Sequence, residues 1–176
     1  MKKLLAMLMS ILMSGCVKVP PGVTPVSEFN LNQYLGVWYE VARLDHSFER
    51  GLNNVTAEYS MRPGGGVTVK NRGFLVKRGE WRDAEGKAFF VNEPNVGHLK
   101  VSFFPPFYGS YVIFKLDQDY QYAFVCGDDT SYLWLLSRTP EPDQEILDDF
   151  ESMARSRGFD TSKLIYVHHS PQQEKG

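Results

Sequence analysis

The sequence has few cysteines, no excess of basic charge and only a short apolar run at its start. Two cysteines among 176 residues allow at most one disulfide bond, so a disulfide framework does not hold the chain together. Lysine and arginine number 19 against 21 acidic residues, which argues against nucleic acid as a partner because phosphate binding needs a basic surface. The apolar run covers residues 4–13, too few to cross a bilayer as a helix, which takes about 20 residues.

Signatures of catalysis and metal binding are also lacking. The chain has no Gly-x-Ser-x-Gly elbow. Cys126 ends the apolar run YQYAFVC, which predicts a buried and inert thiol. Glu40 is an acidic residue in an apolar stretch, but one buried acid is not a catalytic pair. Four histidines lack the spacing of metal ligands to one another and a carboxylate: His46, His98, His168 and His169. We therefore expect no enzyme, no cofactor and no metal site.

The N-terminus predicts an export signal. Two lysines and the apolar run indicate a signal peptide over residues 1–15. The letters MSGC at 13–16 resemble the lipobox of bacterial lipoproteins, in which small residues precede a cysteine that becomes acylated, here Cys16. Val17 follows in place of Asp, which resembles lipoproteins of the outer membrane. The alternative is an ordinary secretory signal with an incidental cysteine.

The domain organisation follows from this signal. Residues 16–27 contain three prolines and a glycine and predict a lipidated tether, residues 28–170 a single domain, and residues 171–176 a flexible tail. With Cys16 acylated, Cys126 has no partner in the chain, so we expect the core alone to stabilise the domain.

Short alternating runs separated by turn residues dominate the rest of the chain and predict β-strands. Residues 54–61 and 67–75 alternate clearly, and the PGGG turn between them predicts a hairpin, since glycine readily adopts positive φ. The further apolar runs are 36–45, two around Trp81 and Phe90, 99–103, 111–116, 120–126 and 132–136, so that nine runs supply the eight strands that we expect.

An amphipathic helix is predicted over residues 143–157, followed by a short strand over 164–167. Together these elements predict an all-β fold, an eight-stranded antiparallel up-and-down barrel with one C-terminal α-helix packed outside. Ala57, Val69, Asn71 and Gly73 share the inward phase of two strands. Because these residues are small or medium in size, the pattern favours a cavity over a solid core.

Three stretches, in the order expected of such a barrel, resemble the signatures of the lipocalin family. They are NQYLGVWYE at 32–40, LDQDY at 116–120 and LLSRTP at 135–140. The stretches HSFERG, KVSFF and PFYG are similar to the bacterial outer-membrane lipocalins, the lipoprotein branch near apolipoprotein D. The resemblance covers essentially all of residues 26–170.

This resemblance implies a barrel open at one end and closed at the other by a 3₁₀ turn near residues 31–34. It implies structural roles for Gly36, Trp38 and Arg138, with the guanidinium stacked on the indole ring. It also implies an outer-membrane-anchored protein that stores or transports fatty acids or (lyso)phospholipids in its cavity. The alternatives are a lipid-modifying enzyme on the same fold and a structural envelope lipoprotein without a ligand, and whether two copies form a homodimer stays open.

Alternation and the resemblance together select candidate ligand contacts. The expected lipid-binding residues are Ala57, Tyr59, Val69, Asn71, Ala88, Phe90, Leu99, Val101, Phe103, Tyr111, Tyr132 and Trp134. We expect about half of them to touch ligand and the others to be packed core. The expected mouth loops are 45–53, 76–80, 104–109 and 128–131. Arg50, Lys77 and Arg78 lie in or beside the first two, as candidates for a phosphate headgroup or as solvated surface charge.

Overall fold

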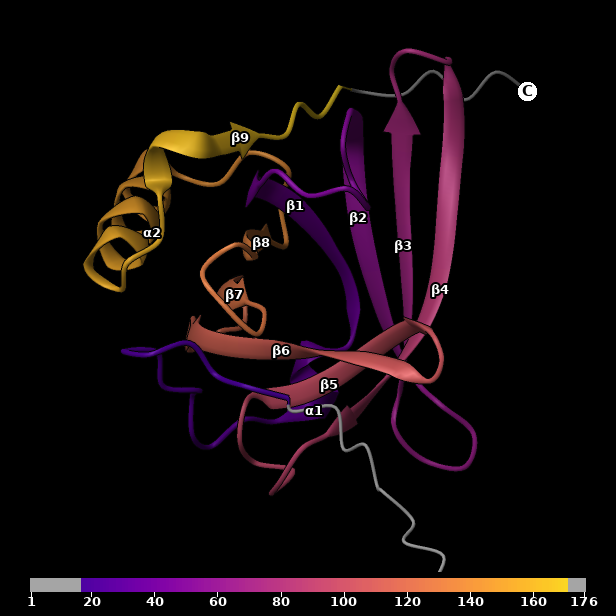
Figure 1. The fold of residues 1–176 in the computed structure, drawn as a ribbon, viewed down its shortest axis with the longest axis vertical. Helices are drawn as coiled ribbons and strands as arrows, with labels where there is room; N and C mark the ends of the chain where they lie inside the picture. The colour runs from indigo at the N-terminus through magenta and orange to yellow at the C-terminus, as the bar shows by residue number, and fades with distance from the viewer. Residues whose placement is uncertain (1–16, 171–176) are drawn as a thin grey trace, which may run out of the picture.

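A computed structural model describes residues 17–170, which form a closed antiparallel barrel (Figure 1). Its strands are β1 (Gly36–Leu44), β2 (Leu52–Met61), β3 (Val67–Leu75), β4 (Glu80–Phe90), β5 (His98–Phe104), β6 (Phe107–Leu116), β7 (Tyr122–Cys126) and β8 (Leu133–Ser137). Each strand pairs with the next in sequence, and β1 pairs with both β2 and β8, which closes the ring. The eight-stranded up-and-down barrel expected from the sequence is confirmed.

Four elements lie outside the ring: α1 (Leu31–Tyr34), α2 (Gln144–Ser156), the 3₁₀ helix η1 (Thr161–Lys163) and β9 (Leu164–Tyr166). β9 pairs with the last residues of β1, and α2 lies next to it on the side of the barrel away from β3 and β4 (Figure 1). Phe150 and Ala154 of α2 are buried against the outer wall of the barrel, as the apolar stripe of the predicted helix required.

Two details differ from the sequence-based expectations. The runs around Trp81 and Phe90 belong to one continuous strand, β4, which pairs with β3 from Val67↔Ala88 to Leu75↔Glu80. Polar residues between the two runs suggested an interruption, but exposed positions on the outer face of a barrel tolerate them. The turn expected near residues 31–34 is a single turn of α-helix capped by the Asn30 side chain, which accepts from Asn32 N.

The connections between strands gather at two ends of the barrel. One end, which we call the closed end, carries α1, residues 62–66, 91–97 and 117–121. The other end, the mouth, carries residues 45–51, 76–79, 105–106 and 127–132. The hairpin turn expected at residues 63–66 is confirmed: Gly66 has φ +84°, and a Cβ there would lie 2.7 Å from the Ala88 carbonyl oxygen.

Trp38 and Arg138 fill the closed end. Trp38 is fully buried and donates from Nε1 to the Tyr34 carbonyl at 2.8 Å, which ties β1 to α1. The guanidinium carbon of Arg138 lies 3.9 Å from the centre of the Trp38 ring. The same guanidinium donates to the carbonyls of Val37 (2.9 Å), Gln33 (2.9 Å) and Leu35 (3.0 Å). One side chain thus joins the end of β8 to the start of β1 and to α1.

Gly36 makes this close approach feasible. Its φ of +97° lies in the left-handed region, and a Cβ at this position would lie 3.4 Å from Arg138 Nη1. A larger residue would therefore be strained in its backbone and would crowd the guanidinium.

The signal peptide expected over residues 1–15, the acylation site Cys16 and the tail expected over 171–176 lie outside the described residues. From Val17 onward, the segment expected to be a tether packs along the barrel, with Pro20 and Val23 buried. Its apolar side chains contact the outer core, which a composition rich in proline does not reveal.

Cys126 is a free, buried thiol on the outer side of β7, within the core that α2 covers. Burial raises the pKa of this thiol to about 12, and the charge of Asp128 acts in the same direction. The sequence-based expectation of a buried cysteine is confirmed.

We expect Arg138→Met to lower the free energy of unfolding by about 2–4 kcal/mol, because it removes the cation–π contact and leaves several carbonyls without a donor. Urea unfolding followed by circular dichroism measures this. The matched substitution Arg155→Met removes an exposed arginine of α2 whose only ion pair among the described residues is with Glu151 at 3.6 Å. A loss for Arg138→Met no larger than that for Arg155→Met contradicts the role of the guanidinium.

Candidate ligand-binding site

The barrel interior holds a cavity of about 100 Å³ with an almost wholly apolar lining. Small side chains such as Ala57 and Ala88 leave this space, because larger residues at these inward positions would fill it. Ten of the twelve predicted lipid-binding residues line the cavity: Ala57, Tyr59, Val69, Asn71, Ala88, Leu99, Val101, Phe103, Tyr111 and Trp134.

A wider cavity of about 500 Å³ continues toward the mouth. Five of the expected residues line it: Asn71, Val101, Phe103, Tyr132 and Trp134. Glu49 and Val55 also line both cavities, so the two spaces adjoin. Phe90 lines neither, because its ring packs 6.1 Å from Phe29 at the closed end. Ligand contact by these residues stays a prediction.

Three tyrosines form a hydrogen-bonded cluster inside the small cavity. The Tyr111 hydroxyl lies 2.7 Å from that of Tyr34 and 2.8 Å from that of Tyr59. Burial is the main reason that the pKa of each phenol is raised, so all three stay neutral. The hydroxyls of Tyr59 and Tyr111 therefore bond within this cluster.

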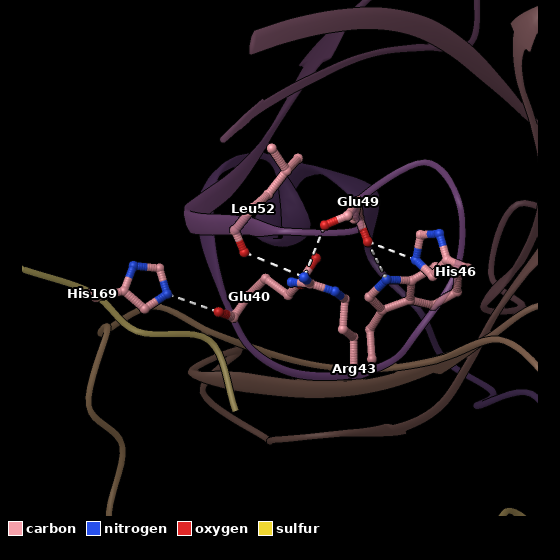
Figure 2. A network of polar contacts seen from close by, with 7 residues as sticks. Glu40, Arg43, His46, Glu49, Leu52 and His169 are labelled. Carbon is pink, nitrogen blue, oxygen red and sulfur yellow. Dashed lines mark hydrogen bonds and ion pairs between the residues drawn. The ribbon is translucent and has the colours of Figure 1, made fainter. Parts of the chain in front are cut away.

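A charged network borders the inner cavity, at the place where Glu40 and Glu49 line it. The sequence pattern did not predict it. Arg43 Nη1 donates to Glu40 Oε1 at 2.7 Å, and both side chains are almost completely buried. Arg43 Nη2 donates to the carbonyls of Glu49 (2.8 Å) and Leu52 (3.2 Å). Figure 2 shows Arg43 between Glu40 and Glu49, with His46 beyond Glu49.

A β-bulge explains why alternation alone does not find this pair. Residues three apart in a regular strand face opposite sides, so Glu40 and Arg43 would be separated by the sheet. The register of β1 against β8 shifts between Glu40 and Ala42, and the extra residue brings both side chains to one side. The available sequence signal was the presence of two opposite charges in the otherwise apolar stretch GVWYEVARL.

Glu49 forms the other half of the network, at the boundary of the two cavities. Its Oε2 lies 2.7 Å from His46 Nε2 and accepts from Trp134 Nε1 at 3.0 Å. Burial pushes the pKa of Glu49 upward, but the contacts with His46 and Trp134 and the charge of Arg43 outweigh it and hold the pKa below its ordinary value. Burial, and then the Glu49 charge, raise the pKa of Glu40 well above its ordinary value. Of the two carboxyls, that of Glu49 is therefore the stronger acid.

His169 is also attached to this region. Its Nε2 donates to the Glu40 carbonyl oxygen at 2.7 Å (Figure 2). Its ring packs edge-on against that of Tyr39, with the ring centres 5.4 Å apart. Burial lowers the pKa of His169. The segment after β9 is thus held on the outside of β1 and β2.

Two polar atoms that face the cavities have no protein partner among the described residues. The Asn71 side chain lines both cavities, and its buried Oδ1 accepts no hydrogen bond. Ser102 lines the mouth cavity, and its buried Oγ is likewise without a partner. Because an unsatisfied buried polar group is costly, both atoms suit hydrogen bonds to a bound molecule.

The three headgroup candidates lie at the mouth end, outside the lining of either cavity. Arg50 is exposed and pairs with Asp45 at 2.9 Å, and Arg78 lies 3.8 Å from Glu80. The arginines that do line the mouth cavity are Arg72 of β3 and Arg82 of β4. They also have acidic partners, Asp83 at 3.5 Å from Arg72 and Glu80 at 3.0 Å from Arg82.

Within residues 17–170, no group of three or more histidine, cysteine or acidic side chains is placed to hold a metal ion. No helix in the same range is long and apolar enough to span a bilayer.

Residues 29–169 match the family of lipocalin-like domains. The chain belongs to the lipocalin family. The outer membrane lipoprotein Blc of Vibrio cholerae serotype O1 is 61% identical over 168 residues, which cover 95% of this chain and 98% of that protein. The protein of the same name from Escherichia coli strain K12 is 52% identical over 148 residues, 84% of each chain.

These relatives confirm the resemblance to bacterial outer-membrane lipocalins and support a lipid-anchored location at the outer membrane. Among solved structures, insecticyanin from the tobacco hornworm Manduca sexta superposes with a TM-score of 0.69 at 22% identity, covering 88% of each chain. That likeness shows the lipocalin barrel itself, which positions the two cavities described above.

The charged network of this lipocalin predicts that the free energy of unfolding depends on pH. The folded-state pKa of Glu49 lies below its ordinary value of 4.5. The ionised carboxyl therefore stabilises the fold fully at pH values above 4.5, and this stabilisation is lost as the pH falls through the folded-state pKa. We expect Glu49→Gln to lower the free energy of unfolding by about 1–3 kcal/mol at pH 7. The difference in free energy of unfolding between this variant and the unsubstituted protein should become smaller as the pH falls.

Chemical unfolding at several pH values between 3 and 7 measures this difference. Glu58→Gln, which changes an exposed carboxyl of the neighbouring strand, should alter the free energy of unfolding by less than about 0.5 kcal/mol. If the loss of free energy of unfolding in Glu49→Gln stays constant down to pH 3, the stabilising role of the ionised Glu49 carboxyl is contradicted.

Proposed function

We propose that this lipocalin stores or transports fatty acids or lysophospholipids at the outer membrane, with the acyl chain in the barrel. The observation that carries the proposal is the apolar inner cavity that adjoins a wider, more polar mouth cavity. A fatty acid or lysophospholipid likewise has an apolar part, its acyl chain, and a polar end. The volume of about 500 Å³ at the mouth lies in the range typical of small-molecule pockets, about 300–1,000 Å³.

Burial of apolar surface supplies the attraction for the chain. Each square ångström of apolar surface removed from water contributes about 25 cal/mol, so a long acyl chain gains several kcal/mol without any specific contact. This term is non-directional, which suits a carrier of acyl chains of different lengths. Specificity then depends on the polar groups of the mouth.

Asn71, Ser102, Arg72 and Arg82 are the groups suited to the polar end of the ligand. Asn71 and Ser102 bring hydrogen-bonding atoms without protein partners, and the two arginines bring positive charge. An arginine guanidinium binds a phosphate or carboxylate through two parallel hydrogen bonds. Arg50, Lys77 and Arg78 remain candidates for the same role, at a greater distance from the cavity lining.

Filling the inner cavity tests the position of the chain. We expect Ala57→Trp to weaken the binding of a fluorescent fatty acid at least tenfold, because the indole occupies the space that the acyl chain needs. Glu58→Trp places the same side chain on the exposed face of the same strand and should leave the affinity unchanged. Titration followed by the fluorescence of the bound fatty acid measures both affinities.

The same titration separates the proposal from its alternatives. Saturable binding at one site supports the carrier. Absence of binding and of any change in Trp emission favours a structural lipoprotein. Release of product from phospholipid above a protein-free blank would establish an enzyme instead.

A charge series tests the headgroup. We expect the double substitution Arg72→Ala with Arg82→Ala to weaken lysophospholipid about tenfold and a neutral fatty alcohol hardly at all, because only the phosphate pairs with a guanidinium. Arg50→Ala with Arg78→Ala should have a smaller effect. Equal losses for the two ligands in the first double variant rule out headgroup recognition by these arginines.

A further inference from the structure

The N-terminal segment runs along the outside of the barrel in a defined direction. At its start, Lys18 N donates to Asp128 Oδ1 at 3.3 Å, and the Lys18 carbonyl accepts from the Ser110 hydroxyl. Asp128 lies in a mouth loop, and both Ser110 and Asp128 line the mouth cavity. The first described residues are therefore attached to the rim of the mouth.

The same segment reaches the closed end about ten residues later. Val26 N donates to the Ile113 carbonyl at 2.9 Å, and Gly97 N donates to the Val26 carbonyl at 2.9 Å. Phe29 N then donates to the Asn95 carbonyl at 2.8 Å. Hydrogen bonds to side chains at the Lys18 end and to the backbone at the Val26 end fix the direction of the segment, so the chain leaves the barrel at the mouth.

The acylated residue is close to this exit. Cys16 precedes Lys18 by two residues, and an extended chain advances at most about 3.6 Å per residue, so their Cα atoms can be no more than about 7 Å apart. Several acyl chains on one cysteine hold a protein firmly in a bilayer. The bilayer surface must therefore lie within a short distance of the mouth rim.

The mouth also carries the most exposed aromatic side chains. Among large hydrophobic residues of the described chain, Phe107 (78% exposed), Phe104 (68%) and Phe48 (67%) rank highest. Phe104 and Phe107 pair across the tip of the β5–β6 hairpin, and Phe48 lies in the loop between β1 and β2. Exposed apolar groups gathered at one site mark an interaction surface.

Further side chains of this end suit a lipid surface. Val76, which is half exposed, lies in the β3–β4 turn beside Lys77 and Arg78. Cations next to apolar side chains favour the interface of a bilayer that contains anionic lipids. The headgroups that these cations meet would then belong to the membrane and not to the ligand in the cavity.

We propose that the mouth faces the bilayer that holds the acylated N-terminus, with Phe104, Phe107 and Phe48 inserted in its interface. The cavity then opens directly onto lipid, so a fatty acid or lysophospholipid enters or leaves it without crossing water. This route deepens the proposed function and rests on it for the nature of the cargo, whereas the orientation depends only on the chain exit and the exposed aromatics.

Site-specific labels on the full acylated protein test the orientation. The protein is inserted in vesicles of phosphatidylethanolamine and phosphatidylglycerol, with an environment-sensitive fluorophore on Phe107→Cys or on Val76→Cys at the mouth. Pro63→Cys, in the exposed turn at the closed end, is the matched control. Cys126 is buried and so stays unlabelled in the folded protein.

We expect lipids with a nitroxide on the acyl chain to quench both mouth labels, and aqueous iodide to quench them at least threefold less than the label at residue 63. The reverse pattern overturns the proposal, as does free access of iodide to all three labels. Mouth labels shielded from iodide but not quenched by nitroxide lipid show that another copy of the chain covers the mouth, which also overturns it.

If Phe107→Cys fails to fold, Val76→Cys still reports the orientation of the mouth, because Val76 lines neither cavity. The fatty acid titration is performed on the same preparation. Saturable binding with labels open to water refutes the orientation alone. Absence of binding with labels in lipid refutes the proposed cargo alone.

Discussion

The pairing of β1 with β2 is the constraint on which the rest of the structure depends. It turns a row of eight strands into a ring, so alternate side chains must face a common interior. Arg138 supports this closure, because its guanidinium covers Trp38 and donates to the backbone at the start of β1. Without a closed ring, neither the inner cavity nor a defined mouth would exist.

Closure also explains how a barrel with an apolar interior contains buried charge. The bulge in β1 brings Glu40 and Arg43 to one side, and the loop that follows carries Glu49 and His46 over the same place. Each charge is paired or hydrogen-bonded, which is the condition for burying it. The network joins the β1–β2 loop to Trp134 at the boundary of the two cavities, so the loop at the mouth is held by contacts inside the barrel.

Much of the fold and most of the cavity lining could be predicted, because a period of two decides which side chains point inward. Ala57 and Val69 were found in this way, and both line the inner cavity. The same rule failed where the regular strand is interrupted, as at Glu40 and Arg43. Phe90 points inward as the rule requires, but it packs on Phe29 at the closed end and lines neither cavity. The headgroup candidates were chosen by loop position, which says little about distance from a cavity.

The sequence by itself determined the strand pattern, the turn at residues 63–66 and the amphipathic helix, since each depends on residues near one another in the chain. Only the tertiary structure decided the contact of Lys18 with the mouth rim, the gathering of Phe48 with Phe104 and Phe107 at one end, and the partners of Glu49. These features join residues far apart in sequence, and their distances follow from closure of the ring and from the bulge that shifts its register.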